Sequence, residues 1–238
     1  MKLHILAIAA HPDDVELSCA GTLLKHSSLG YKCGVLDLTS GELGTRGSGE
    51  LRLIEAANAA VILGLQVRDN LKMADGFFRN DKEHQLEIIK KIRHYQPELV
   101  LCNAVSDRHP DHGRAAQLVS EACFYSGLTR VQTQVDGMEQ EAWRPKAVYH
   151  YIQDRQLKPD FVVDVTAFVD KKMEAIQAFK SQFYDPDSKE PQSPISVKNF
   201  LDVVKGKMAV FGRDAGFDYA EGFTAERTPG LTDLFKLV

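Results

Sequence analysis

The sequence has few cysteines and prolines and no excess of glycine, and each of these features excludes a class of protein. Its 238 residues include four cysteines, none of them in a C-x-x-C pair: Cys19, Cys33, Cys102 and Cys123. This spacing excludes a disulfide framework and a thiolate zinc site, and it favours a reducing compartment. With 17 glycines and 9 prolines, the composition also excludes collagen-like and low-complexity chains.

Long apolar runs and a strong net charge are missing as well. No stretch approaches the ~18 apolar residues that a membrane-spanning helix needs. The apolar run at 5–10 is shorter than a usual signal-peptide core, so it predicts a buried strand instead. A net charge of -4 provides no field that would attract nucleic acid or an anionic membrane. We therefore expect a cytoplasmic protein whose partner is a small molecule.

Short apolar runs alternate with helical patterns along the first half of the chain. Strands are expected at 3–8, 33–38, 65–67 and 98–102, and helices at 15–29, 50–63, 83–95 and 113–125. Gly30 and Gly64 are placed to end two of these helices. The order predicts a Rossmann-like α/β fold, a mostly parallel sheet with helices on both faces.

The second half of the sequence is less regular. Strands are expected at 147–152 and 161–165, and helices at 167–183 and 197–211. The segment 184–194 contains three prolines and many polar residues, which is typical of a surface excursion and of a flexible lid. Because no linker divides the chain, we expect one domain over 1–238.

Two four-residue motifs repeat the same chemistry about a hundred residues apart. HPDD at 11–14 and HPDH at 109–112 each follow a predicted strand and precede a predicted helix. Loops that leave the carboxyl ends of neighbouring parallel strands face the same crevice, so the motifs are expected to form one site. Together they supply six side chains that bind metals or transfer protons, namely His11, Asp13, Asp14, His109, Asp111 and His112.

Two imidazoles and one carboxylate form the ligand set of a catalytic metal with open positions for water and substrate. We assign His11, Asp14 and His112 as the ligands of one divalent metal per subunit, with zinc favoured and ferrous iron as the alternative. Asp13 and His109 are then free to move protons, Asp13 as a base and His109 at the leaving group. Asp and His are also common at helix starts, but two such motifs together favour the metal site.

The loop 39–49 holds four glycines but neither a G-x-G-x-x-G nor a Walker sequence, which disfavours nucleotide binding. Thr45 and Arg46 in this loop are candidate substrate ligands, as are Arg52 and Arg108. Guanidinium groups bind carboxylates in a bidentate way, so these arginines suit an anionic substrate. The alternative is that at least one of them pairs with an acidic residue of the chain itself.

The motifs resemble those of a known family. AHPDDVE at 10–16 followed by HPDH at 109–112 resembles the LmbE/PIG-L family of metal-dependent sugar N-deacetylases. DLTSGELGTRG at 37–47, DGFF at 75–78 and YAEGF at 219–223 are similar to the bacillithiol biosynthesis deacetylases within it. This resemblance implies release of acetate from N-acetylglucosaminyl malate, and a homo-oligomer is common in the family.

The resemblance also implies roles for single residues. It places the metal ligands on the three residues already assigned and the general base on Asp13. It implies that His109 stabilises the oxyanion and protonates the amine, with Asp111 orienting it. Arg52 matches an arginine that the family uses on its substrate, and Arg108 is a weaker match.

Other functions remain open at this stage. Within the deacetylases, N-acetylglucosaminyl inositol, chitooligosaccharides and mercapturate-type conjugates are alternative substrates. Two histidines and one carboxylate also form the facial triad of non-haem iron oxygenases, although alternating strands and helices argue against their jelly-roll folds. A metal-holding module without turnover is the third class, and acetate release would distinguish the three.

Overall fold

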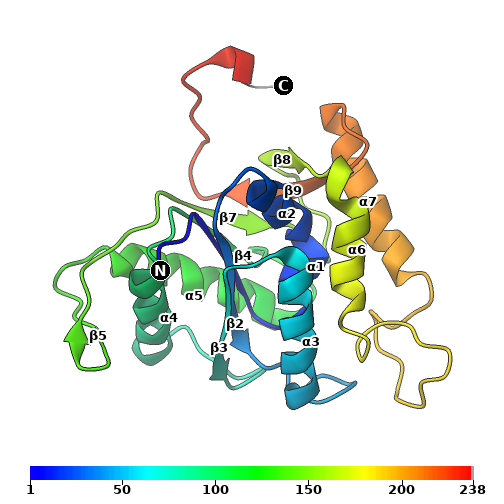
Figure 1. Ribbon diagram of the computed structural model, residues 1–238, viewed down its shortest axis with the longest axis horizontal. Coiled ribbons are helices and arrows are strands. Elements are labelled where there is room, and N and C mark those ends of the chain that lie inside the picture. Colours follow the sequence, from blue (N-terminus) through cyan, green and yellow to red (C-terminus); the bar gives the residue numbers. More distant parts are fainter. Residues whose placement is uncertain (237–238) are drawn as a thin grey trace.

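A seven-stranded sheet runs through the middle of the molecule (Figure 1). The computed structural model describes residues 1–236. In sheet order the strands are β3 (Val67–Met73), β2 (Cys33–Thr39), β1 (Ile5–Ala9), β4 (Leu99–Cys102), β7 (Ala147–Tyr151), β9 (Ala220–Ala225) and β8 (Phe161–Asp164). The first five are parallel, whereas β9 is antiparallel to both β7 and β8. The predicted single-domain α/β fold with a mostly parallel sheet is confirmed.

Helices cover both faces of this sheet, as predicted. Figure 1 shows two helices on one face, α4 (Lys82–Tyr95) and α5 (Pro110–Ser126). The other face is covered by α1 (Asp14–Ser18), α2 (Ala20–Ser28), α3 (Gly49–Leu63), α6 (Val169–Gln177) and α7 (Phe200–Ala215). Every residue of the central strand β1 is buried, because parallel strands with helices on both sides lose contact with water on both faces.

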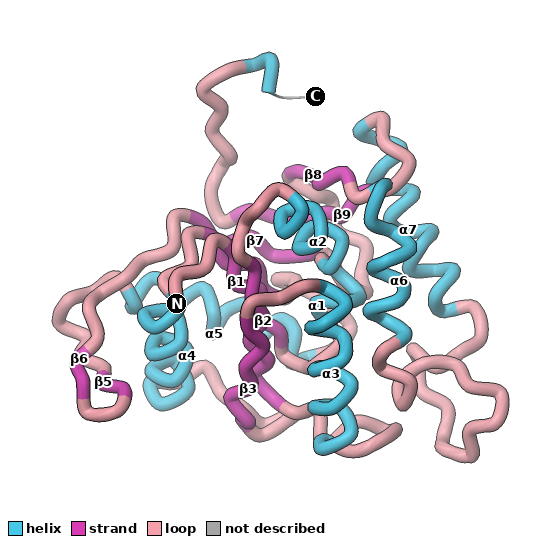
Figure 2. Tube along the Cα trace, viewed as in Figure 1, coloured by secondary structure: helices cyan, strands magenta, loops and turns pink. Residues whose placement is uncertain are grey.

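The short elements lie at the periphery. A two-stranded hairpin of β5 (Gln134–Val135) and β6 (Met138–Glu139) projects from the main body (Figure 2). The 3₁₀ turn η1 (Thr166–Phe168) precedes α6, and a second 3₁₀ turn, η2 (Leu234–Lys236), ends the described chain. Among residues 1–236, no helix combines the length and the apolar character that crossing a membrane requires.

The helix expected at 15–29 is two helices, and the reason lies far away in the sequence. The backbone leaves helical geometry at Cys19, where φ is -133°. The Glu221 carboxylate on β9 accepts hydrogen bonds from the N–H groups of Gly21 (2.9 Å) and Thr22 (2.7 Å). A carboxylate at a helix start satisfies free N–H groups and favours the helix dipole, so it supports a second helix start here.

Several other boundaries differ from the prediction. The strand expected at 65–67 is β3, which extends to Met73 through polar residues because it lies at the sheet edge. The helix expected at 167–183 ends at Gln177, and residues 219–223, for which no element was predicted, largely form β9. Helix α5 begins at Pro110, three residues earlier than expected, so the HPDH motif forms its first turn.

Candidate metal centre

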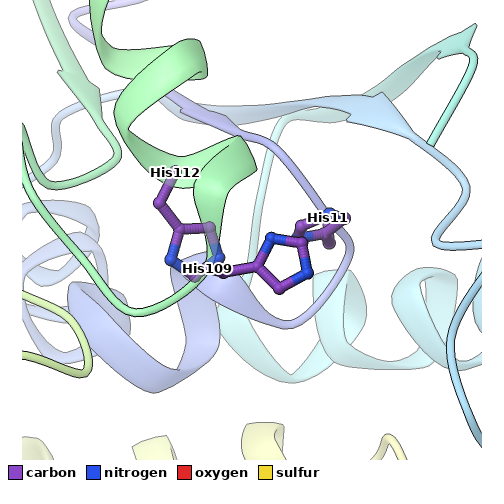
Figure 3. Close-up of side chains that lie close together, drawn as sticks. All are labelled: His11, His109 and His112. Carbon is purple, nitrogen blue, oxygen red and sulfur yellow. The ribbon is translucent and has the colours of Figure 1, made fainter. Parts of the chain in front are cut away.

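The two motifs meet because the strands before them are neighbours. Strands β1 and β4 pair in parallel with Ile8 opposite Cys102, so the loops after both strands leave the same edge of the sheet. Figure 3 shows the imidazoles of His11, His109 and His112 turned toward one another. Each offers a nitrogen, and these nitrogens lie within 4.8 Å of one another.

Asp14 lies between two of these histidines. Its Oδ1 is 3.2 Å from Nε2 of His112, and its Oδ2 is 3.6 Å from Nδ1 of His11. The same carboxylate accepts hydrogen bonds from the side-chain amides of Asn103 (2.9 Å) and Gln153 (2.6 Å), which fix its orientation. Asp14 therefore contacts both histidines that were assigned with it from the sequence as metal ligands.

In His11 and His112, the ring nitrogen that faces away from Asp14 contacts another carboxylate. Nδ1 of His112 is 2.6 Å from Asp107, and Nε2 of His11 is 3.0 Å from Asp75 and 3.2 Å from Asp111. Metal-binding imidazoles characteristically donate their second N–H to a carboxylate, which fixes the tautomer and the ring. The arrangement therefore fits a divalent metal held by His11, Asp14 and His112.

Asp107 stays ionised for this task. Burial alone would raise the pKa of its carboxyl, but the hydrogen bonds from His112 and from the N–H groups of Arg155 and Arg108 lower the pKa to about 2. A permanently charged acceptor holds the imidazole of His112 with Nε2 toward Asp14.

Asp13 has an unusual backbone and an unsatisfied side chain. Its φ is 107°, in the region that favours glycine, and it is 4 % exposed. Its Oδ2 lies 3.3 Å from Nη2 of Arg52 but has no hydrogen bond to any described residue. Backbone strain of this kind persists at functional sites. Burial raises the pKa of Asp13 to about 7, against the opposing effect of Arg52, which suits a general base near neutral pH.

His109 caps helix α5. Its Nδ1 accepts a hydrogen bond from the N–H of Asp111 (3.3 Å), so the neutral ring carries its proton on Nε2. His109 also lines the cavity described below. Burial, together with the charges of His11 and His112, lowers the pKa of His109 below its ordinary value. The side chain is therefore a neutral N–H donor.

The position of Asp111 differs from the prediction. Its carboxylate accepts hydrogen bonds from the N–H of Gly76 (2.9 Å) and from Arg114 (2.5 Å), and it contacts His11. Only its backbone N–H reaches His109. Because α5 starts at Pro110, the Asp111 side chain points away from the helix cap, so it orients His11 rather than His109.

The three candidate arginines line the cavity, but each is engaged within the chain. Arg52 donates to the carbonyl of Pro12 (3.0 Å) and to Gln182. Arg46 donates to Ser188 (2.6 Å) in the excursion 184–194, and its Nε lies 3.6 Å from Glu190 of the same segment.

Arg108 is the most exposed of the three. Its side chain is 49 % exposed and pairs with Asp154. The alternative that the sequence left open, pairing with acidic residues of the chain, is thus realised in all three arginines. Thr45 lies on the cavity wall, and the excursion 184–194 packs against the glycine loop through Arg46 and through the N–H of Gly47, which donates to Glu190 (2.9 Å).

A cavity of about 460 Å³ opens over the motifs. Several of the residues that complete the site were not singled out in the sequence. Asp107 lies five residues before His112 in a polar stretch, and Gln153 follows β7 at the same sheet edge as the motifs. The rule that ligands bind beyond the carboxyl ends of parallel strands would have indicated Gln153. Glu221 lies in the YAEGF stretch at 219–223 that carries part of the resemblance, whereas nothing in the local sequence indicates Lys172.

The fold and the site define an α/β protein with a cluster of histidines and carboxylates at the strand ends that could hold a metal ion. The family model described as PIG-L, GlcNAc-PI de-N-acetylase, matches residues 6–123. The 4-oxalmesaconate hydratase of Pseudomonas putida is 30% identical over 196 residues, which cover 74% of this chain and 73% of that protein. The chain belongs to the PIG-L family.

Relatives named as deacetylases are similar over most of their length. The diacetylchitobiose deacetylase of Thermococcus kodakarensis is 28% identical over 232 residues, 92% of this chain and 81% of that protein. A probable N-acetyl-alpha-D-glucosaminyl L-malate deacetylase of Bacillus anthracis is 28% identical over 201 residues, 76% of this chain and 81% of the relative. The crystal structure of a conserved protein from Thermus thermophilus has 33% identity, a TM-score of 0.86 and 97% coverage of both chains.

Proposed function

We propose that this protein is a metal-dependent N-deacetylase that hydrolyses the acetamido group of an N-acetylated aminosugar. The observation on which this rests is the position of Asp13: a strained, buried carboxylate with an unsatisfied oxygen, directly beside the converging His11, Asp14 and His112. The deacetylase relatives and the family support the same reaction.

His11, Asp14 and His112 would hold the metal. When bound there, a divalent metal supplies Lewis acidity, which makes water easier to deprotonate and the amide carbonyl easier to attack. Zinc is our proposal for the native metal. Ferrous iron accepts the same two nitrogens and one carboxylate, so metal analysis of the isolated protein decides between them.

The side chains divide the remaining chemistry. Asp13 takes a proton from water as the water oxygen bonds to the acetamide carbon. The Nε2–H of His109 donates a hydrogen bond to the carbonyl oxygen as that oxygen becomes negative. In place of the amine protonation that the sequence resemblance implies for His109, we propose that Asp13 gives its proton to the nitrogen. The carbon–nitrogen bond then breaks, and acetate and a free amine leave. The lowered pKa of His109 favours this neutral role over a resident positive charge.

The two parts of the proposed substrate, the reacting sugar and the group attached to it, rest on different observations. Names of relatives in the family include both a chitobiose and a glucosaminyl malate deacetylase, which share N-acetylglucosamine. Malate would bring two carboxylates, and the bacillithiol role proposed from the sequence depends on them. Since Arg46, Arg52 and Arg108 are already engaged, we propose N-acetylglucosamine as the reacting unit and treat its partner group below.

Acetate release tests the proposal. Protein stripped with a chelator and reloaded with zinc or, without oxygen, ferrous iron is incubated with diacetylchitobiose and with N-acetylglucosaminyl malate. We expect equal amounts of acetate and amine from at least one substrate, only after reloading. Reloaded protein that releases no acetate from any N-acetylglucosaminide contradicts the proposal, and oxygen consumption with an oxo-acid would support an oxygenase instead.

The hydratase relative defines a second assay. Addition of water to 4-oxalmesaconate involves an unsaturated tricarboxylate, whose binding calls for free cations that pair with its carboxylates. The engaged arginines argue against this substrate, so we expect no hydration of 4-oxalmesaconate by the zinc-loaded or the iron-loaded protein. The homo-oligomer and the cytoplasmic location stay predictions; gel filtration and fractionation of cells test them.

A further inference from the structure

The cavity has two ends of different character. The part of the lining at the motifs is polar, whereas the part that we call the far end is formed by one face of α7 together with α1, the segment after β7 and the loop before α7. The α7 residues on this wall are spaced as one side of a helix. The apolar side chains of the far end are Leu17, Ile152, Ile195, Phe200, Val203, Val204, Met208 and Phe211.

A buried ion pair lies beside this apolar wall. Nζ of Lys172 is 2.6 Å from Oε1 of Glu221, and both side chains are at most 1 % exposed. The N–H groups of Gly21 and Thr22 satisfy the same carboxylate. A charge that is paired and hydrogen-bonded in this way is unavailable to a ligand, because withdrawing it leaves its partner unpaired in a buried position.

The other cations of the wall are also engaged. The ammonium of Lys207 donates to the backbone carbonyls of Gln153 and Asp154, the second at 2.7 Å. Burial lowers the pKa of Lys207 from its ordinary value. Arg46 and Arg52 donate to Ser188 and Gln182 inside the chain, although the Nε of each has no hydrogen bond to a described residue, and Arg108 pairs with Asp154. The cations that line the cavity therefore all have partners within the described chain.

We propose that the far end of the cavity binds an apolar group attached to the reacting N-acetylglucosamine, an aryl or alkyl substituent rather than a dicarboxylate. This inference rests on the proposed deacetylase function. Apolar surface that leaves water against these side chains stabilises the complex in proportion to its area. A malate carboxylate in the same place loses its hydration without gaining a cation.

Substrate preference is the first test. Acetate release is compared for phenyl N-acetylglucosaminide, diacetylchitobiose and N-acetylglucosaminyl malate with the zinc-loaded protein. We expect kcat/KM for the phenyl glycoside to exceed that for the malate glycoside at least about tenfold, equivalent to about 1.4 kcal/mol. Equal values, or a higher value for malate or for the second sugar, overturn the proposal.

A pair of matched variants locates the effect. Val203 lines the cavity, whereas Val210, on the same helix, does not, and the two are 54% and 55% exposed. Val203→Arg introduces a cation at the far end without disturbing the core, and Val210→Arg is its control. We expect Val203→Arg to lower the phenyl-to-malate ratio of kcat/KM by about tenfold or more, and Val210→Arg to leave it unchanged.

The outcomes separate two failures. If both arginine variants shift the ratio equally, or neither shifts it, the far end does not contact the substituent and the inference fails. If no N-acetylglucosaminide is deacetylated at all, the proposed function fails with it. Acetate release with a preference for malate leaves the deacetylase intact and removes only the apolar site.

Discussion

The two motifs share His-Pro-Asp, yet their third residues do different things. In the first motif, Asp13 has a left-handed backbone and an oxygen without a hydrogen bond. In the second motif, Asp111 is a regular helix residue, fully buried, whose carboxylate contacts Gly76, Arg114 and His11. The same residue type at the same motif position thus keeps an oxygen without a hydrogen bond, beside Arg52, in one loop and is occupied in holding a neighbour in the other.

This difference has a backbone origin. The first motif precedes α1, and Asp13 lies outside that helix with its carboxylate directed toward the cavity. The second motif lies inside the first turn of α5, which directs the Asp111 carboxylate toward the loop that contains Gly76. Sequence similarity between two motifs therefore does not establish that their corresponding residues share a role.

The largest effect is expected when the proposed metal, which residues of both motifs would hold, loses one of its ligands. His112→Gln removes the nitrogen that faces Asp14, and we expect loss of bound metal and of detectable acetate release. Metal analysis and an acetate assay measure both quantities. His94→Gln, an exposed histidine on α4, is the control and should match the parent protein. Full metal content in His112→Gln would contradict the ligand assignment.

Replacing Asp13, the carboxylate of the first motif that has an oxygen without a hydrogen bond, is the next test. Asp13→Asn keeps the shape of the side chain but removes the base, so we expect kcat to fall by roughly a hundred- to ten-thousandfold. Metal content should be unchanged. A variant that turns over normally would remove Asp13 from the mechanism, and one that loses its metal would place Asp13 among the ligands.

The matching change in the second motif should have a different consequence. Asp111→Asn weakens the contact with Nε2 of His11, so we expect metal affinity to fall by about tenfold to a hundredfold. At saturating metal, kcat should recover to near the parent value. If Asp111→Asn instead resembles Asp13→Asn at saturating metal, the contrast between the two motifs is wrong. Metal titrations monitored by acetate release distinguish the cases.

The smallest effect on substrate binding is expected from replacing Arg108, the residue that precedes the second motif. Arg108 is half exposed and pairs with Asp154, and a pair of this kind contributes little. We expect Arg108→Gln to change KM for N-acetylglucosaminyl malate by less than about threefold, the change that corresponds to roughly 0.6 kcal/mol. An increase of tenfold or more would show that Arg108 leaves Asp154 to bind the substrate.

The parallel half of the fold could be predicted because its strands are buried on both faces and therefore read as short apolar runs. The polar edge strand β3 and the antiparallel β9 lack that pattern. The break at Cys19 could not be predicted locally, because the Glu221 carboxylate that supports α2 lies about 200 residues later in the chain.

The candidate site shows the same division. The histidines and carboxylates of both motifs can be recognised in the sequence, and the pairing of β1 with β4 brings the two motifs together. The partners of the arginines could not be predicted, since Arg46 pairs with a residue of the excursion 184–194 and Arg52 with Gln182. Only the folded chain shows that these cations are engaged, and this is why we propose an apolar substituent in place of the anionic one expected from the sequence.

The origin of the oxygen in the released acetate tests the central claim most directly. Zinc-loaded protein is given diacetylchitobiose and phenyl N-acetylglucosaminide in water labelled with heavy oxygen, and the acetate is analysed by mass spectrometry. Hydrolysis of the amide with Asp13 as base predicts a single labelled oxygen in each acetate and almost no acetate from Asp13→Asn. Unlabelled acetate, or equal release by Asp13→Asn with its metal retained, would contradict the account.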